Sequence, residues 1–355
     1  MGERQGRKMK KEYELLLYAV LTSKKEKEIL EIDDLLKEKL DWCEISGQII
    51  NHRLCGYFYN GLIDKQRKRL PKELEAMLKL IVSLQKEQFM EKMNEFEKLS
   101  NSIEREGIRY AGLKGLAFCA DFYQLGDRRS NDIDIMVIED DLNKLDKCLR
   151  DLGYVQSFRP DGRIQEATRR EKLIQRMNYH DLVPYVKELN NSVIEIDVNF
   201  KFDSKEHLID NDIFEYGTQI YSNNGYSVRG LPVYTHLLFL CIHFYREGTN
   251  TLWTTGRNDI LLYKVADIMN LLRAHRDEFK VKEWCNLVLK FELEKKCYYT
   301  FYMLSQFYND SVLYEIIENL KPSDDSFLNE IYVEGENKII RREEGFYESA
   351  FNWIR

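Results

Sequence analysis

The chain has 355 residues, enough for two domains or for one core domain with substantial additions. Its 44% hydrophobic and 32% charged residues are an ordinary globular balance, and no segment approaches the ~18 consecutive apolar residues that a membrane span needs. The formal net charge of −7 provides no broad basic face, so general nucleic-acid binding is not expected, although a local basic pocket for a nucleotide remains compatible with it.

Residues 10–99 carry a helical pattern. The stretches "YELLLYAVL" and "KEILEIDDLLKEKLDWCEI" place apolar residues three and four positions apart, with charges between them. A long amphipathic stretch that begins at Leu70 stops at Gly107, a residue type that often ends a helix. We therefore expect helical packing, and no chemistry, from residues 1–106.

Strand and helix patterns alternate closely after Gly107. In chain order they are the strand "IRYAGL", the short helix "LAFCADFYQL", the alternating strand "DIDIMVI", the helix "DLNKLDKCLRDLGY" and the strand "SVIEIDVNFKF". This order fits an α/β or an α+β class, and we predict α+β with a small mixed sheet in residues 107–231. Pro232 marks a boundary, and helical patterns return over residues 232–355.

Two aspartates interrupt one of these hydrophobic strands. Asp132 and Asp134 point to the same side because side chains alternate along a strand, with Ile133 and Ile135 packing behind them. Their α-carbons lie about 6.6 Å apart, so the carboxylates can converge. Buried carboxylates are costly without a positive charge between them. The pair indicates a magnesium site, with room for two ions, or else a solvated strand face.

A turn before this strand has the features of a phosphate loop. A strand runs into Lys114 and Gly115, and a helix begins directly after them. Glycine lets a backbone approach a phosphate closely, and the free amides at a helix start favour an anion. Arg128 and Arg129 then precede the carboxylate strand, with Arg128 the preferred phosphate ligand. An ordinary strand-to-helix turn is the alternative for the glycine motif alone.

A third carboxylate follows in "VIEIDVNF". Glu195, Asp197 and Asn199 share one strand face. Asp197 has apolar neighbours on both sides, so we predict that it completes the metal site or takes a proton from an attacking hydroxyl as a general base. Glu195 either supports the site from behind or is exposed.

The combination "LKG", "RRSNDIDIMV" and "EIDVNF" resembles the nucleotidyltransferase superfamily of the DNA polymerase beta type. It is most similar to a bacterial group of uncharacterised nucleotidyltransferases, which has Leu-Lys-Gly where many relatives have Gly-Ser. Further parts of that group's pattern match Leu152-Gly153-Tyr154 and the set His243, Lys264 and Asp267. The resemblance covers about residues 107–275.

The resemblance implies a nucleotidyltransferase core with helical N- and C-terminal additions. It implies attack of an acceptor hydroxyl on the α-phosphorus of a nucleoside triphosphate, most simply ATP, with release of pyrophosphate. The implied metal ligands are Asp132, Asp134 and Asp197, for two Mg²⁺ ions or for Mn²⁺. The implied nucleotide-binding residues are Lys114, Gly115, Arg128, Arg129 and Lys264.

Several other residues have simpler interpretations. His180 is interpreted as structural, with a loop position near the site as the alternative. His236 and His243 are seven residues apart on one helix face but lack partners at zinc spacing. The segment "HFYREGTNTLWTTGRND" either covers an acceptor pocket or is partly packed between helices and partly exposed to solvent, and we favour packing with exposure.

The acceptor stays open. A small molecule of the aminoglycoside type, a protein hydroxyl and an RNA end are the candidates, and the acidic charge weighs against RNA. The alternative function is a catalytically retired nucleotide-binding or interaction module, for example in a toxin–antitoxin or biosynthetic pair. Seven scattered cysteines without paired short spacing favour reduced thiols and a cytoplasmic location over a zinc site or a disulfide framework.

Overall fold

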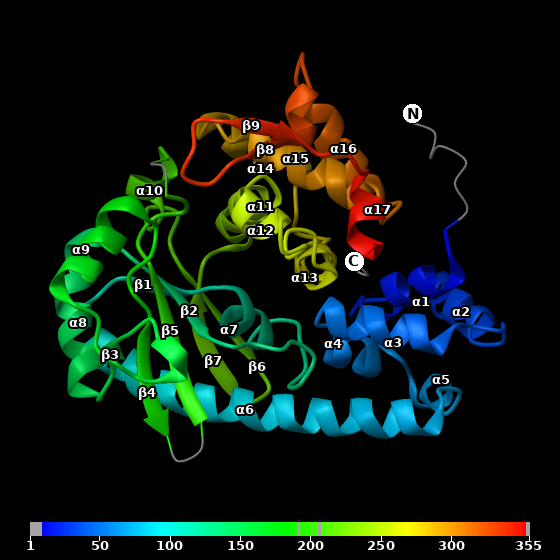
Figure 1. The fold of residues 1–355 in the computed structure, drawn as a ribbon, viewed down its shortest axis with the longest axis horizontal. Coiled ribbons are helices and arrows are strands. Elements are labelled where there is room, and N and C mark those ends of the chain that lie inside the picture. Colours follow the sequence, from blue (N-terminus) through cyan, green and yellow to red (C-terminus); the bar gives the residue numbers. More distant parts are fainter. Residues whose placement is uncertain (1–8, 190–191, 205–206, 353–355) are drawn as a thin grey trace.

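The computed structural model describes residues 9–189, 192–204 and 207–352, and it is centred on a mixed seven-stranded sheet of order β3-β4-β5-β2-β1-β7-β6. Helices lie on both sides of this sheet (Figure 1). The predicted α+β class is confirmed. The strands of the sheet are β1 (Tyr110–Gly112), β2 (Ile133–Val137), β3 (Val155–Gln156), β4 (Tyr185–Leu189), β5 (Ser192–Asn199), β6 (Gln219–Asn223) and β7 (Tyr226–Gly230).

Strands β2 and β5 form the middle of the sheet and run parallel to each other. All five residues of β2 are buried, because the strand has neighbours on both edges and packing on both faces. The register places Ile133 opposite Ile196 and Asp134 opposite Asp197. Since side chains alternate, the apolar pair and the acidic pair point to opposite faces. The predicted packing of Ile133 and Ile135 behind the aspartates is confirmed, as both are buried.

The predicted helices before Gly107 are confirmed. Helix α6 has 34 residues and runs below the sheet in Figure 1 towards the other N-terminal helices. Its buried positions include Leu78, Phe89 and Phe96, and it ends next to Gly107, whose φ of +65° suits glycine. The N-terminal helices are α1 (Lys11–Ala19), α2 (Glu26–Leu35), α3 (Trp42–Asn51), α4 (Cys55–Gly61), α5 (Asp64–Arg67) and α6 (Lys72–Arg105).

The remaining helices include two elements that face the cavity described below, α11 and α13. They are α7 (Lys114–Cys119), α8 (Leu142–Asp151), α9 (Arg169–Asn178), α10 (Ile209–Asp212), α11 (Val233–Gly248), α12 (Thr251–Thr254), α13 (Leu262–Ala274), α14 (Val281–Lys290), α15 (Glu294–Ser305), α16 (Ser311–Leu320) and α17 (Phe346–Phe351). Three 3₁₀ turns occur at Glu139–Asp141, Pro160–Gly162 and Ser326–Asn329. Within the described residues, none of the helices is long and apolar enough to cross a membrane.

Two short strands lie in the C-terminal region, where the sequence indicated helices. Strands β8 (Glu330–Tyr332) and β9 (Ile339–Arg341) pair antiparallel, and a bridge links Tyr332 to Asn250. Three-residue strands carry too little alternation to stand out in a sequence. The same holds for β3, which has two residues.

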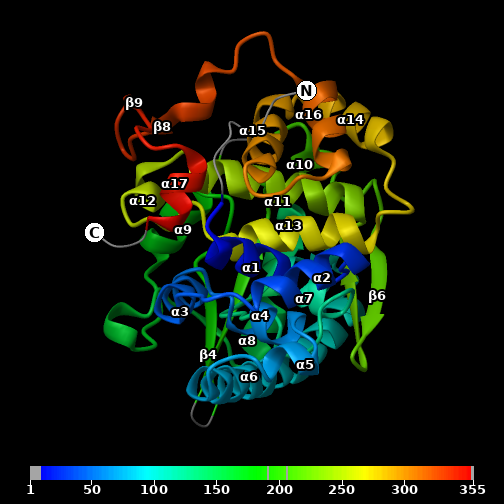
Figure 2. The ribbon, with the colours of Figure 1, turned by 90° about the vertical axis from the view of Figure 1, so that its right-hand side faces the viewer.

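Helices from the two ends of the chain lie side by side (Figure 2). The side chain of Arg273 in α13 makes two hydrogen bonds to the carboxylate of Glu28 in α2, at 2.8 and 2.7 Å. The hydroxyl of Tyr308 donates to the carbonyl of Leu17 at 3.0 Å. The N-terminal helices are therefore anchored to the C-terminal ones, and the division at residues 106 and 231 stays a prediction.

A buried histidine that connects the N-terminal helices to α13 makes the stability of the fold depend on pH. His52 is buried, and its Nδ1 accepts a hydrogen bond from the backbone N–H of Leu262 at 3.1 Å. Burial lowers the pKa of His52 to about 3. The unfolded chain takes up this proton near pH 6.5, but the folded chain does not, so stability present above pH 6.5 is lost as the pH falls towards 3. Between pH 6.5 and pH 5 the loss is about 2 kcal/mol.

The variant His52→Gln tests this expectation, because its amide oxygen can accept the same hydrogen bond without titrating. Urea unfolding at pH 7 and pH 5 should show a smaller loss of stability in the variant than in the wild-type chain. An equal loss in both would show that His52 titrates normally in the folded protein.

Candidate active site

A cavity of about 470 Å³ opens between the sheet and helices α11 and α13. Its size lies in the range of small-molecule sites. All but one of the predicted site residues line it, namely Lys114, Arg128, Arg129, Asp132, Asp134, Asp197 and Lys264. Gly115 is buried behind the wall and is not among the lining residues.

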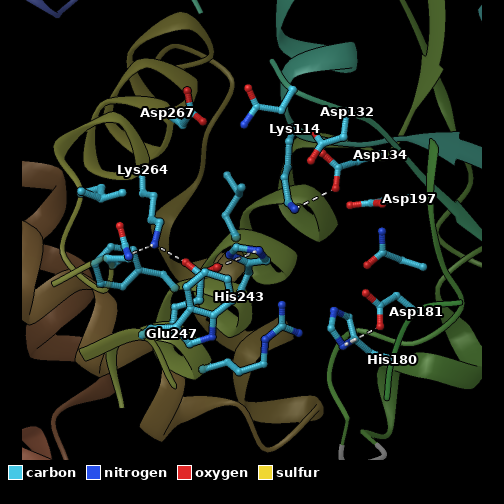
Figure 3. A pocket seen from close by; sticks show the side chains of 18 of the residues that line it. Lys114, Asp132, Asp134, His180, Asp181, Asp197, His243, Glu247, Lys264 and Asp267 are labelled. Atoms are coloured by element: carbon cyan, nitrogen blue, oxygen red, sulfur yellow. Dashed lines mark hydrogen bonds and ion pairs between the residues drawn. The ribbon is translucent and has the colours of Figure 1, made fainter. Parts of the chain in front are cut away.

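The three predicted carboxylates face the same end of this cavity (Figure 3). Asp134 lies in β2 directly opposite Asp197 of the parallel strand β5, and Asp132 immediately precedes β2. Asp134 is only 4% exposed, whereas Asp132 and Asp197 are partly exposed. The neighbouring parallel strands thus bring together residues that are 63 and 65 positions apart in the chain.

Lys114 is held against this carboxylate group. Its backbone has a φ of +44°, and its N–H donates to Nε2 of His236 in α11 at 3.0 Å. Its side-chain Nζ lies 2.8 Å from Oδ1 of Asp134. Burial opposes the charged form of Lys114, but the charges of Asp134 and Asp132 outweigh it and raise the pKa of the ammonium. A left-handed backbone at a non-glycine residue is strained and occurs often at functional sites.

The carboxylates carry more negative charge than Lys114 can neutralise. Oδ1 of Asp197 is buried and has no hydrogen-bond partner among the described residues. Burial, together with the charges of Asp132, Asp134 and Glu195, raises the pKa of Asp197 well above its usual value. Burial and the charge of Asp132 likewise raise the pKa of Asp134, against the opposing effect of Lys114. The site therefore attracts a cation.

The residues present suit magnesium, which prefers hard oxygen ligands and few protein groups. The unpartnered buried oxygen of Asp197 and the excess negative charge are the observations that fit it. Within residues 9–189, 192–204 and 207–352, however, no three His, Cys, Asp or Glu side chains are arranged to hold one ion as they stand. A bound ion would thus use fewer than three of these groups or draw their side chains together.

Arg128 has a structural partner that the sequence did not reveal. Its Nε donates to Oδ2 of Asp267 in α13 at 2.9 Å, and both side chains are buried. Oδ1 of Asp267 accepts hydrogen bonds from the hydroxyls of Tyr57 in α4 and Tyr123, at 2.7 and 2.9 Å. The segment before β2 is thereby fixed to both terminal regions.

Gly115 makes room for this arginine. A Cβ at position 115 would lie 2.5 Å from Nη1 of Arg128 and 3.3 Å from Oγ of Ser130. The glycine in "LKG" is thus explained by the close approach of Arg128, and its predicted contact with a phosphate stays a prediction.

Arg129 and Lys264 differ in their freedom to meet a ligand. Arg129 is exposed and bonds only to Oδ1 of Asn131 among the interactions described, at 3.0 Å. Lys264 is buried, forms an ion pair with Glu247, and donates to the carbonyls of Asn258 and Asp259 at 2.7 and 3.3 Å. Its ammonium protons already have acceptors, so Lys264 orients the 247–259 segment, and its predicted contact with nucleotide is untested.

The opposite cavity wall contains residues that the sequence analysis assigned to packing or did not consider. Arg246, Glu247 and Trp253, from the segment expected to be packed with partial exposure, line the cavity, so packing and exposure alone do not describe that segment. His180 and Asp181 also line the cavity, but on the side of the strand carboxylates (Figure 3). A backbone bridge sets Asp181 beside Asn199 of β5, and no local pattern in "MNYHDL" indicates this long-range pairing.

The fit between Gly115 and Arg128 can be tested by Gly115→Ala. The added methyl must displace a guanidinium that Asp267 holds, so we expect a loss of about 1–3 kcal/mol in the free energy of unfolding. Gly256→Ala is the matched control, because Gly256 is exposed and its methyl would meet the end of the flexible Asn258 side chain. Equal stability of the two variants in urea unfolding would contradict the fit.

Comparison with known proteins agrees with this geometry. The family model described as "Uncharacterised nucleotidyltransferase" matches residues 38–309, which exceeds the segment that the motifs alone covered. Searches of curated proteins and of solved structures found no significant match. The match includes the carboxylate strands, the Lys114 turn and helices α11 and α13. The chain therefore belongs to this family of uncharacterised nucleotidyltransferases and is an enzyme of the nucleotidyltransferase type.

Proposed function

We propose that this enzyme transfers a nucleotidyl group, in the simplest case adenylyl from ATP, to a hydroxyl of a small molecule or a protein. The observation that carries the proposal is the parallel register of β2 and β5, which sets Asp134 opposite Asp197 in a cavity that also contains Asp132 and Lys114. Binding of a metal–triphosphate complex requires carboxylates that hold the metal ion and a positively charged side chain near the phosphates.

The reaction is an in-line displacement. The acceptor oxygen forms a bond to the α-phosphorus, while the bond between that phosphorus and the α,β-bridging oxygen breaks and its electron pair leaves with pyrophosphate. The acceptor proton passes to Asp197, whose Oδ1 lacks a partner among the described residues. Catalysis of this kind consists mainly of positioning and charge stabilisation.

Asp132, Asp134 and Asp197 would hold Mg²⁺, or Mn²⁺ in its place, which when bound supplies positive charge beside the phosphates. Arg129 is exposed and free to reach a phosphate oxygen. Arg128 contributes a positive charge from a fixed position, because Asp267 holds its Nε. Lys114 is the third cation on this side of the cavity.

The cavity supports a small acceptor group. A volume of about 470 Å³ accommodates a small molecule or one protruding side chain together with part of the nucleotide. The rest of its lining carries both charges, with Arg246, Lys264, Glu247 and Asp181. A polynucleotide acceptor fits less well with the net charge of −7.

Calorimetric titration tests the donor site. Each of the four common nucleoside triphosphates is titrated into the protein with Mg²⁺ and, separately, with chelator. We expect Mg²⁺-dependent binding of at least one nucleotide, and a loss of at least tenfold in affinity in Asp132→Asn. Asp140→Asn, at an exposed carboxylate outside the cavity, is the control and should bind like the wild-type chain. Nucleotide binding that is unchanged by the chelator and by Asp132→Asn would contradict the proposed site.

A second test measures how far the unneutralised negative charge of the aspartates destabilises the fold. Asp197→Asn removes one of three mutually repelling carboxylates without changing the side-chain size. We expect its melting temperature in chelator to exceed that of the wild-type chain, while Mg²⁺-dependent nucleotide binding is lost, because functional sites retain charges that destabilise the fold. A variant that is less stable than the wild-type chain in chelator would show that Asp197 has a structural role.

A further inference from the structure

Lys114 already occupies part of the carboxylate group that is proposed to bind metal. Its Nζ lies 2.8 Å from Oδ1 of Asp134, which is the most buried of the three aspartates. A site for two ions would need oxygens of all three aspartates to be available to metal. Here one oxygen of Asp134 is engaged by an ammonium group instead.

The ammonium group of Lys114 is positioned by the backbone of Lys114 itself and by residues of helix α11. The left-handed backbone of Lys114 and the hydrogen bond from its N–H to His236 fix the start of the side chain. Its Nζ lies 5.8 Å from the ring centroid of Phe239, within the range of a cation–π contact. The side chain is 18% exposed, and its tip points to Asp134 (Figure 3).

The charges that remain amount to those of one divalent ion. After Lys114 pairs with Asp134, the remaining carboxylates of the three are Asp132 and Asp197, with a combined charge of −2 when both are ionised, as metal binding requires. The side chain of Asp132 forms no ion pair with the described residues, and Oδ1 of Asp197 is the buried oxygen without a partner. One Mg²⁺ balances this charge, whereas a second would add two positive charges next to the ammonium.

The other buried cations of the cavity cannot take this role. Arg128 is paired with Asp267 and Lys264 with Glu247, so each has its own carboxylate away from the strand aspartates. Figure 3 shows Lys264 and Glu247 on the wall opposite the strand carboxylates. Lys114 is the cavity cation that bonds directly to a strand carboxylate in the described structure.

We propose that the Lys114 ammonium stands in for one of the two metal ions, so that the site holds a single divalent ion between Asp132 and Asp197. The inference rests on the proposed function and goes beyond it, since it fixes the metal count and assigns Lys114 as a permanent cation of the site. It replaces the expectation of two ions. The lysine side chain remains on Asp134 when a triphosphate is present.

Manganese provides the measurement, because its electron paramagnetic resonance spectrum distinguishes an isolated ion from two ions about 4 Å apart, the spacing of two-metal sites. The protein is equilibrated with Mn²⁺ alone and with Mn²⁺ plus tripolyphosphate, which carries no base and so makes no assumption about the nucleobase. Bound manganese per chain is counted after removal of free ions. The variants are Lys114→Met, which removes the charge, and Lys114→Arg, which keeps it.

We expect one bound ion and an uncoupled six-line spectrum for the wild-type chain and for Lys114→Arg, with and without tripolyphosphate. Lys114→Met should bind a second ion and show a spin-coupled spectrum. Two coupled ions in the wild-type chain would overturn the inference but leave the proposed function standing. No bound ion in the wild-type chain would overturn both.

A single ion in Lys114→Met would show that the lysine does not set the count and would also overturn the inference. Because Lys114→Met leaves Asp134 buried without its partner, circular dichroism and a melting curve accompany each variant. If Lys114→Met does not fold, the wild-type and Lys114→Arg counts still decide between one ion and two.

Discussion

The repulsion among three carboxylates on two neighbouring parallel strands is the constraint on which the site depends. The register of β2 and β5 forces Asp134 and Asp197 together, and the alternation of side chains adds Asp132. Such a group is unfavourable in a buried place unless cations accompany it. The left-handed turn at Lys114 and the hydrogen bond from its N–H to His236 position a cation beside these carboxylates, with Nζ 2.8 Å from Oδ1 of Asp134.

Helices of the N- and C-terminal regions stabilise the segment that precedes β2, through contacts made outside the sheet. Asp267 of α13 binds Arg128 and also the hydroxyl of Tyr57 from α4, so three distant parts of the chain meet at one buried carboxylate. Breaking a buried charge pair by removal of one partner is costly. The segment between α7 and β2 therefore cannot shift without disturbing both terminal regions. All three residues lie within residues 38–309, the part of the chain that the family model matches.

Local pattern was sufficient to identify the central strands and the aspartates. Asp132, Asp134 and Asp197 interrupt apolar alternation, and that signal lies within a few residues. The partner of Arg128 is 139 residues away, and the carboxylate that binds Lys264 lies on another helix, so neither pairing leaves a local trace. Strands β3, β4, β6, β7, β8 and β9 also went unpredicted, since tertiary pairing establishes them more than their own propensity does.

The two walls of the cavity differ in the sign of the buried charge that lacks a hydrogen-bond partner among the described residues. On the helical wall Lys264 pairs with Glu247, while Nη1 of Arg246 is buried without a hydrogen-bond partner in the described structure. On the strand wall Asp197 keeps a buried oxygen without a partner in the described structure. Burying polar groups without partners is unfavourable, and proteins retain such groups mainly where a ligand completes them. Each wall therefore offers such a group to a ligand, a carboxylate oxygen of Asp197 for a cation on the strand wall and the guanidinium of Arg246 for an anionic group on the helical wall.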